Sequence, residues 1–411
     1  MTKRNLSNPK NIFLAAILLL GGTGQAFSQA TSGANVLTTA MPFLNIPVDA
    51  RAAGMGDVGV STSFDANASF WNPSKTVFSE KKYGVALSYT PWLKSLVNDM
   101  SLSYLTGFYK INERQALDIG MTYFNLGSIQ YTDANGGSLG DGRPREFSIR
   151  AHYSTKLSDQ FSIAVGGFYA NSNITQGLGG SGSANPTRPG NTAGADISAF
   201  YRKTGLTLAQ LPLDISAGVN ISNIGAKVSY GGNNQRDFIP TNFRIGSTGK
   251  VSLDPYNKLA VSLEFNKLLV PTPPVRDSQG NIISGKDPRD ITLLQGIFGS
   301  FSDAPGGFGE EMREFMINFG TEYSYSDEQG NELFLVRGGY VHEAQDKGDR
   351  KYFTAGIGAR YQVFGLDVAY MIPTTRSSPL ANTLRFTLHL NFGSSNNNSN
   401  SNGVPETAPA N

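Results

Sequence analysis

The sequence predicts an all-β fold: a transmembrane outer-membrane β-barrel of about 14 antiparallel strands. Apolar and polar residues alternate with a period of two along many segments, and the connections between these segments alternate between short and long. An N-terminal export signal precedes them. Only 16% of the residues are charged, whereas the chain has 47 glycines, 25 phenylalanines and 17 tyrosines. That composition is typical of β-structure with tight turns and an aromatic, lipid-facing surface.

The two ends of the chain are predicted to lie outside the folded domain. Lys3 and Arg4 precede the apolar run IFLAAILLL at 12–20, and the small-residue stretch GGTGQAFSQA follows. These are the parts of a secretory signal, so residues 1–28 are predicted to be a cleaved signal peptide. A membrane-anchoring helix is the alternative, but the apolar run falls short of the about 20 residues that span a bilayer. Residues 393–411, rich in Ser, Asn and Pro, are expected to form a disordered tail.

The stretch GMGDVG at 54–59 matches the G-x-G-x-x-G pattern of dinucleotide-binding turns. Such a turn needs a buried apolar strand before it and a helix after it. Here VDARAA precedes the match, and a poor helix, FDANASFWNP, follows it after a short linker. A nucleotide site is therefore not predicted. Gly54, Gly56 and Gly59 are interpreted instead as positions where backbone packs closely in a crowded lumen.

Fourteen segments show the alternation expected of barrel strands. In QALDIGMTYF, for example, Leu117 and Ile119 share one face, and Asp118 and Gly120 share the other. The predicted strands cover residues 83–90, 98–109, 115–126, 146–156, 160–172, 193–203, 214–222, 242–252, 257–268, 314–326, 331–341, 351–362, 364–372 and 383–392. A soluble β-sandwich would carry Lys and Glu on its solvent face, whereas here one face is continuously apolar. A barrel over 83–392 is therefore predicted, because closure in lipid pairs every strand edge.

The predicted connections alternate in length along the chain. YKINERQ, KLSDQ, SLDPYN, SDEQGN and the residues around Val363 are short, whereas those at 127–145, 173–192, 223–241 and 269–313 are long. Outer-membrane barrels have short periplasmic turns and long outer loops. We therefore expect the long loops to be extracellular and both termini to be periplasmic. One periplasmic turn, TGLTLAQLPL at 204–213, is unusually long for this arrangement.

The longest predicted loop, 269–313, carries large apolar residues. PTPPVRD is too rich in proline for a regular helix or strand. Residues 288–300 have apolar residues at helical spacing after Pro288, so we expect a short helix there. The large apolar side chains of the loop are Leu294, Phe298, Phe301 and Phe308. Exposing them is costly unless they pack or bind something, so the loop is interpreted either as folding onto the barrel mouth or as a partner site.

The composition argues against several kinds of site. The chain has no cysteine, which excludes disulfides, thiol catalysis and cysteine-bound metals. The net charge of +2 argues against nucleic-acid binding. His152 and His389 lie on the polar faces of predicted strands, and with no recognisable nucleophile they are interpreted as structural lumen residues. The acidic residues of loop 269–313 match no calcium motif. We therefore predict no catalytic residue, no metal and no cofactor.

The N-terminal block NVLTTAMPFLNIPVDARAAGMGDVGVSTSFDANASFWNPSK, followed by YGVALSYTPWLKSLVNDMSLSYLTGFYK at 83–110, resembles the PorV/PorQ family of type IX secretion outer-membrane proteins. That family belongs to the wider FadL-like barrel superfamily. The combination of D-x-R-A-x-G-M-G, D-A-N and W-N-P carries the resemblance, and TPWLK…VND favours the PorV branch. The resemblance implies the same strand number and an N-terminal plug-like segment, here 29–82. Asn72 and Pro73 match the N-P pair of that segment, although serine follows where alanine is usual.

The resemblance also implies a function and a set of partners. Such proteins are not enzymes; they associate with the SprA translocon barrel and bind the C-terminal domain of secreted cargo. They deliver cargo to the PorU sortase, within an attachment complex that also holds PorQ and PorZ. Binding is expected on the outer loops, and we expect Trp92, Leu93 and the segment 298–301 to contact partners. A FadL-like channel for a hydrophobic small molecule is the alternative, and a hydrolase using His152 or His389 is the least favoured hypothesis.

Overall fold

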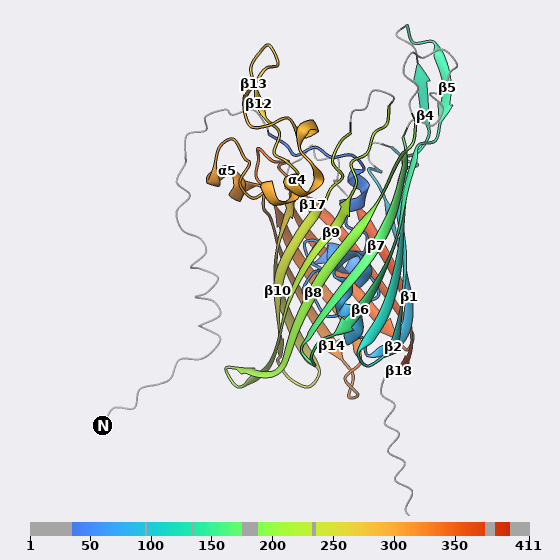
Figure 1. The fold of residues 1–411 in the computed structure, drawn as a ribbon. Coiled ribbons are helices and arrows are strands. Elements are labelled where there is room, and N and C mark those ends of the chain that lie inside the picture. The colour runs from blue at the N-terminus through green and yellow to red at the C-terminus, as the bar shows by residue number, and fades with distance from the viewer. Residues whose placement is uncertain are drawn as a thin grey trace, which may run out of the picture. The chain divides into compact units, whose positions relative to one another are not determined.

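The computed structural model describes residues 35–94, 97–132, 135–174, 188–231, 236–374 and 383–394. Within them, fourteen antiparallel strands close into a barrel, which confirms the predicted fold class (Figure 1). The barrel strands are β1 (Lys81–Pro91), β2 (Ser101–Asn112), β3 (Gln115–Asn125), β6 (Arg145–Lys156), β7 (Phe161–Asn173), β8 (Gly190–Leu208), β9 (Leu211–Gly225), β10 (Asn242–Ser252), β11 (Asn257–Leu268), β14 (Met316–Ser326), β15 (Glu332–His342), β16 (Lys351–Tyr361), β17 (Phe364–Pro373) and β18 (Leu384–Ser394). Each barrel strand pairs with the next, and β18 closes the ring against β1.

The barrel wall has an apolar outer face and a polar inner face. On β3, Ile119 is exposed while the neighbouring Asp118 is buried. On β16, Phe353 and Ile357 are exposed while Thr354 is buried. Lipid accepts the apolar outer side chains without cost, whereas polar groups are tolerated inside because they bond to one another. In the described part of the chain, no helix is long and apolar enough to cross a membrane.

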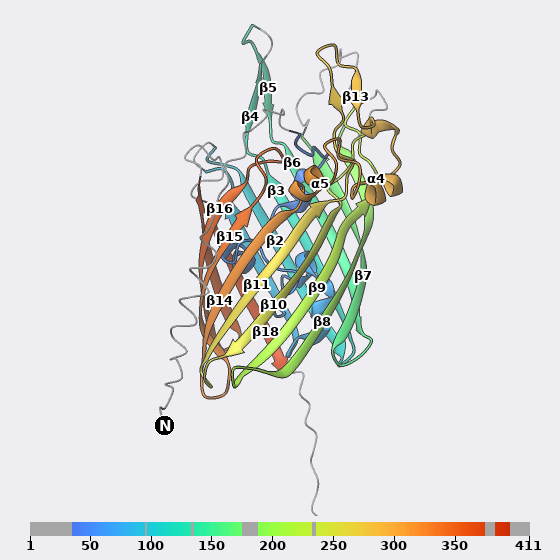
Figure 2. The same cartoon turned by 90° about the vertical axis from the view of Figure 1, so that its left-hand side faces the viewer.

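One end of the barrel has short turns, and the other end has long connections that project from it (Figures 1 and 2). Two of the long connections contain their own hairpins, β4 (Ile129–Thr132) with β5 (Ser138–Gly142), and β12 (Val275–Arg276) with β13 (Ile282–Ser284). The alternation of short and long connections therefore matches the sequence pattern. The PTPPVRD stretch differs from expectation, because two of its residues pair as β12.

Three short helices follow in the connection between β11 and β14: η3 (Pro288–Asp290), α4 (Leu293–Gly299) and α5 (Phe308–Arg313). The single helix predicted over 288–300 is therefore split in two. The division falls at Thr292, whose side chain forms a capping box with Gln295 and starts α4. That S/T-x-x-E/Q spacing is present in the sequence and was a usable signal for the helix start.

The N-terminal part of the described chain lies inside the barrel, where Figure 1 shows it in blue. We call residues 40–80 the lumen segment. It contains η1 (Pro42–Asn45), α2 (Ala50–Gly54), α3 (Ala68–Trp71) and η2 (Pro73–Phe78). Local capping sets these short helices: Asp49 accepts a hydrogen bond from the Ala52 amide at 2.9 Å to begin α2. Pro73 occupies the first turn of η2, where its missing N–H costs nothing.

The β8–β9 hairpin differs from the prediction. Residues 204–213 were expected to form a long turn, but β8 and β9 extend through them to a two-residue turn at Ala209 and Gln210. The barrel also runs from Lys81 to Ser394 instead of 83–392. The first two residues of the predicted tail therefore belong to β18.

The two described ends of the chain lie at opposite ends of the barrel. Asn35 bonds to Asp346 and Glu310, which belong to long connections. Ser394 pairs with Lys81 at the end with short turns. Counting strands alone predicts both termini on one side; that prediction concerns residues outside the described ranges, whereas the described ends lie on opposite sides. The reason is that the lumen segment crosses the barrel once before β1 begins, which adds a pass that strand counting omits.

Candidate functional site

Two glycines of the GMGDVG stretch meet glycines of the barrel wall. A Cβ on Gly54 would lie 3.0 Å from the Cα of Gly356 on β16. The backbone at Gly56 lies against Gly339 on β15, and Gly320, the partner of Gly339 on β14, lies against the neighbouring Met55. Each contact brings main chain against main chain, which a side chain on either partner would block. Gly54 and Gly56 therefore lie where the backbone of the lumen segment meets the backbone of the wall.

Gly59 serves a different contact, against Trp71 within the lumen segment. A Cβ on Gly59 would overlap the indole ring. The amides of Gly59 and Val60 both donate to Oε2 of Glu264 on β11, at 2.8 and 2.9 Å. Amides that would face a phosphate in a nucleotide-binding turn here hold a carboxylate of the wall. The stretch is thus a docking contact with the barrel, in agreement with the rejection of a nucleotide site.

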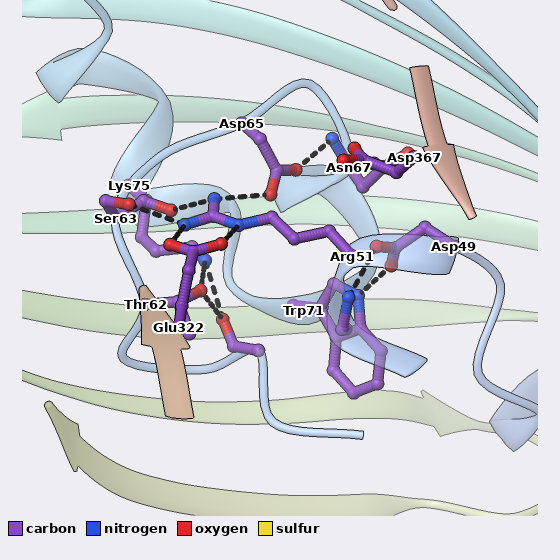
Figure 3. A network of polar contacts seen from close by, with 12 residues as sticks. Asp49, Arg51, Thr62, Ser63, Asp65, Asn67, Trp71, Lys75, Glu322 and Asp367 are labelled. Carbon is purple, nitrogen blue, oxygen red and sulfur yellow. Dashed lines mark hydrogen bonds and ion pairs between the residues drawn. The ribbon is translucent and has the colours of Figure 1, made fainter. Parts of the chain in front are cut away.

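Arg51 joins the lumen segment to the wall through a buried ion pair (Figure 3). Its Nε and Nη2 donate to the two carboxylate oxygens of Glu322 on β14, at 3.0 and 2.8 Å. Its Nη1 pairs with Asp65 at 2.8 Å and also donates to the Ser63 carbonyl. A bidentate guanidinium–carboxylate pair fixes orientation as well as distance. Arg51 therefore holds the fold of the segment and its position against the wall together.

The ion pair continues around the inner wall. Glu322 also accepts from Nε of Arg337 at 2.7 Å, and Arg337 pairs with Asp367 at 2.8 Å. Asp367 in turn bonds to His389 at 2.7 Å and to Arg360 at 2.8 Å. Buried charges are tolerated when each is paired and hydrogen-bonded. The chain of contacts links α2 with β14, β15, β16, β17 and β18.

His152 is a lumen residue whose two ring nitrogens both face carboxylates. Nδ1 lies 2.6 Å from Asp118, and Nε2 lies 3.0 Å from Asp196. Ser69 Oγ is 3.4 Å from the same Nδ1. A general base needs a free nitrogen facing its nucleophile, but here both nitrogens are held by carboxylates. The arrangement supports the structural interpretation of His152 over the hydrolase hypothesis.

Asn72 and Pro73 join α3 to η2 in the lumen segment. The Asn72 side chain donates to the carbonyls of Val60 at 2.8 Å and Ala199 at 3.1 Å, and its oxygen accepts from the Ser74 amide. Asn72 thus ties two parts of the segment to strand β8. The bonds to Val60 and Ser74 are buried and the bond to Ala199 is partly buried, so these hydrogen bonds replace ones that water would provide.

The connection between β11 and β14 forms a second candidate site, which we call the outer platform: residues 288–314, from η3 to α5. Buried ion pairs fasten it to the barrel. Lys267 at the end of β11 pairs with Glu311 and Glu314, and Lys347 pairs with Glu310 and Glu314. Three carboxylates of α5 and its C-terminal end therefore share two buried ammonium groups.

The electrostatics of the platform follow from these contacts. Burial works against ionisation of Glu310, but hydrogen bonds led by that from Lys347 outweigh it, so the pKa of Glu310 lies below its usual value. Burial raises the pKa of Asp303. No group of three or more acidic or histidine residues suited to a metal ion occurs in the described ranges. The charges here fasten the loop to the barrel.

The four predicted apolar residues of the loop all lie exposed on the outer platform. Leu294 is 62% exposed, Phe298 75%, Phe301 46% and Phe308 78%. Met312, 48% exposed on α5, joins them and was not predicted. Its position four residues after Phe308 is the helical spacing that would have identified it. The platform thus folds onto the barrel mouth and still exposes these five large apolar side chains.

Trp92 and Leu93 are placed differently from the platform residues. Trp92 is half-buried and packs edge-to-face on Phe124, with ring centroids 6.0 Å apart. Trp92 also lines a cavity of about 370 Å³ at the long-connection end of the lumen, together with Glu314. Leu93 is half-buried in a left-handed conformation, with φ of 47°. The structure therefore separates the two predicted partner-binding regions into an exposed platform and a partly covered loop.

The sequence profile of a known family, described as "Type IX secretion system protein PorV", matches residues 29–275. The chain belongs to the PorV family. It is therefore an outer-membrane component of type IX secretion, as the N-terminal block at 35–75 indicates. No curated protein matches the sequence significantly.

Solved structures with a similar fold are outer-membrane barrels. The toluene transporter TbuX of Ralstonia pickettii has a TM-score of 0.46 and 12% identity, covering 85% of this chain and 99% of that one. A FadL homologue of Pseudomonas aeruginosa has a TM-score of 0.41 and 11% identity, covering 88% of this chain and 100% of that one.

Proposed function

We propose that this PorV-family protein is a non-enzymatic carrier of secreted proteins. It binds the C-terminal domain of cargo at the SprA-type translocon barrel and passes it to the attachment complex of PorU, PorQ and PorZ. The observation that carries the proposal is the family match over residues 29–275. The long connections face the cell surface in this proposal, and Ser394 faces the periplasm.

The outer platform has the physical properties of a binding surface for a protein. Its apolar side chains Phe298 and Phe308 are exposed, yet the base that holds them is fixed by buried ion pairs of Lys267 and Lys347. A rigid base lowers the entropy lost when a partner binds. Large aromatic side chains also supply most of the binding energy in protein interfaces. These features support cargo or translocon binding on the platform.

The lumen is an unsuitable route for the cargo itself. The lumen segment occupies the barrel interior and is fixed by Arg51 and Glu322. The two cavities found along the lumen, about 370 and 260 Å³, have the volume of a small molecule. We therefore place cargo binding on the outside of the barrel.

Deleting the gene provides the test of the carrier proposal. Proteins with the type IX C-terminal domain are expected to accumulate in the periplasm with that domain uncleaved, which fractionation and immunoblotting will detect. Restoring the gene is the control. Full surface delivery and processing of cargo in the deletion strain would refute the proposal.

A channel for a hydrophobic small molecule is the second candidate function. The observation that favours it is the cavity of about 370 Å³, whose lining includes Val36, Ile46 and Met371. The same deletion strain distinguishes the two functions. Normal secretion combined with impaired uptake of hydrophobic compounds would support the channel, and lipid recovered from pure protein would agree with it.

Substituting the platform aromatics should separate binding from folding. A Phe298→Ser, Phe301→Ser variant is expected to retain several-fold less cargo in pull-downs, because two large apolar contacts are lost. The barrel should remain folded, since Phe298 is 75% exposed. The matched control is Ile283→Ser in the same connection, where a 66% exposed side chain lies on β13, off the platform. Equal cargo retention by both variants would show that the platform is not the binding surface.

A further inference from the structure

The β8–β9 hairpin is formed by the two longest strands of the barrel, of 19 and 15 residues, and carries no charge at its tip. The segment TGLTLAQLPL at 204–213 has no Asp, Glu, Lys or Arg, whereas the β14–β15 turn reads SDEQGN. Its paired positions are Leu206 with Leu213, Thr207 with Pro212, and Leu208 with Leu211. Directly paired residues of antiparallel strands project from the same face. The four leucines therefore form one face, which we call the leucine face, and Thr207 and Pro212 form the other.

A β-bulge puts Leu206 and Leu208 on that face. Lys203 pairs with Ile215 and the next pair is Leu206 with Leu213, so β8 has one residue more than β9 between them. Gly205 adopts φ of 74° at the bulge, and its amide donates to Asp214 at 3.3 Å. An inserted residue reverses which side chains point outward. Strict alternation along β8 would have turned both leucines towards the lumen side.

The leucine face continues the lipid-facing side of the barrel. On β8 and β9, Ile197 and Ile221 form an outward pair, and Ile197 is 44% exposed. Alternation along β9 from Ile221 puts Leu213 and Leu211 on this outward side. Lys203, also outward, marks the base of the hairpin, the level at which lysine side chains reach lipid headgroups. The leucine face begins directly beyond that lysine.

The hairpin bends away from the barrel axis. Figure 1 shows the tip of β8 and β9 leaving the short-turn end sideways, outside the wall below β10. Bulges bend strands in this way. When a strand bends outward, its outward face rotates to point back along the wall, towards the bilayer. The bend therefore turns the leucine face to the membrane and the Thr207 face to water.

We propose that the leucine face is a membrane contact that rests in the phospholipid leaflet at the short-turn end of the barrel. The leucines have no polar groups with which to specify a protein partner, and they extend an interface that is already lipid. The hairpin then acts as a lateral anchor that fixes the depth and tilt of the barrel. This proposal does not depend on the cargo carried.

Spin labels at neighbouring positions test the contact. The chain has no cysteine, so single-cysteine variants can be made directly. Leu208→Cys and the matched control Thr207→Cys would be labelled in the full chain, reconstituted in nanodiscs of phosphatidylethanolamine and phosphatidylglycerol. Gln329→Cys in the β14–β15 turn is the aqueous reference. Folding is checked by the mobility of unheated samples on gels.

The accessibility of each label to oxygen and to a water-soluble nickel complex gives the answer. The ratio of oxygen to nickel accessibility should be several-fold higher at position 208 than at 207, with 207 resembling 329. Equal ratios at 207 and 208 would overturn the proposal. A ratio at position 208 equal to that at position 329, in nanodiscs without a partner protein, would also overturn the proposal. The leucine face would then be available to a protein partner.

Discussion

A Gly56→Val variant will fail to assemble into a stable barrel. Gly56 has φ of 67°, where valine is strongly disfavoured. A Cβ there would lie 2.5 Å from the carbonyl oxygen of Phe319 and 2.8 Å from the amide nitrogen of Tyr340. These are backbone atoms of paired wall strands, so no rotamer change can relieve the contact. Backbone strain and overpacking together should cost about 3 kcal/mol or more.

Gly330→Val is the matched control for this prediction. Gly330 has a comparable φ of 82°, in the β14–β15 turn, but a Cβ there meets nothing within 4 Å. Its cost is limited to backbone strain, about 1–2 kcal/mol. The folded fraction is measured from unheated gel mobility after refolding, and the free energy of unfolding from urea titration. Equal losses in the two variants would show that contact with the wall is not what requires glycine at Gly56.

The strands were predictable because the environment on each side of the wall differs sharply. Lipid outside and polar groups inside impose a period of two over whole strands, as at Ile119 and Asp118. The same rule stopped short at residues 204–213, which were predicted as a long turn, because one inserted residue interrupts the alternation along β8. Nothing in TGLTLAQLPL separates a bulge from a long turn except the glycine at Gly205, and glycine is common to both.

The candidate site was predictable only in part. Exposure of Phe298 and Phe308 follows from their place in a long loop, and Met312 could have been found from helical spacing. The buried partners of Arg51 could not be found, since Glu322 lies 271 positions away and no local pattern joins them. Likewise, the glycines of 54–59 indicate close packing. The sequence does not identify the wall glycines that they contact, because closure of the barrel decides which strands lie there.

An Arg51→Met variant should lose about 3–5 kcal/mol of stability, as expected when one partner of a buried ion pair is removed. The side chains of Arg51 and Glu322 are only 7% and 4% exposed. Methionine fills much of the volume of arginine, so the loss reports charge and hydrogen bonds more than an empty space. Arg289→Met is the surface control. Its pair with Asp287 involves an arginine side chain that is 58% exposed, and loss of such a pair costs about 0–1 kcal/mol.

A second substitution shows whether the unpaired charge causes the loss. Removing Arg51 leaves Asp65 without its cationic partner, while Glu322 keeps Arg337. Adding Asp65→Asn should therefore restore part of the stability of Arg51→Met, so the double variant loses less than the sum of the single losses. Urea unfolding followed by tryptophan fluorescence measures each step, because the Trp71 indole is buried in the lumen segment and the second tryptophan, Trp92, is half-buried. Strict additivity would mean that the unpaired Asp65 carboxylate does not cause the loss, and that Arg51 stabilises the protein through its pair with Glu322 and the packing of its side chain.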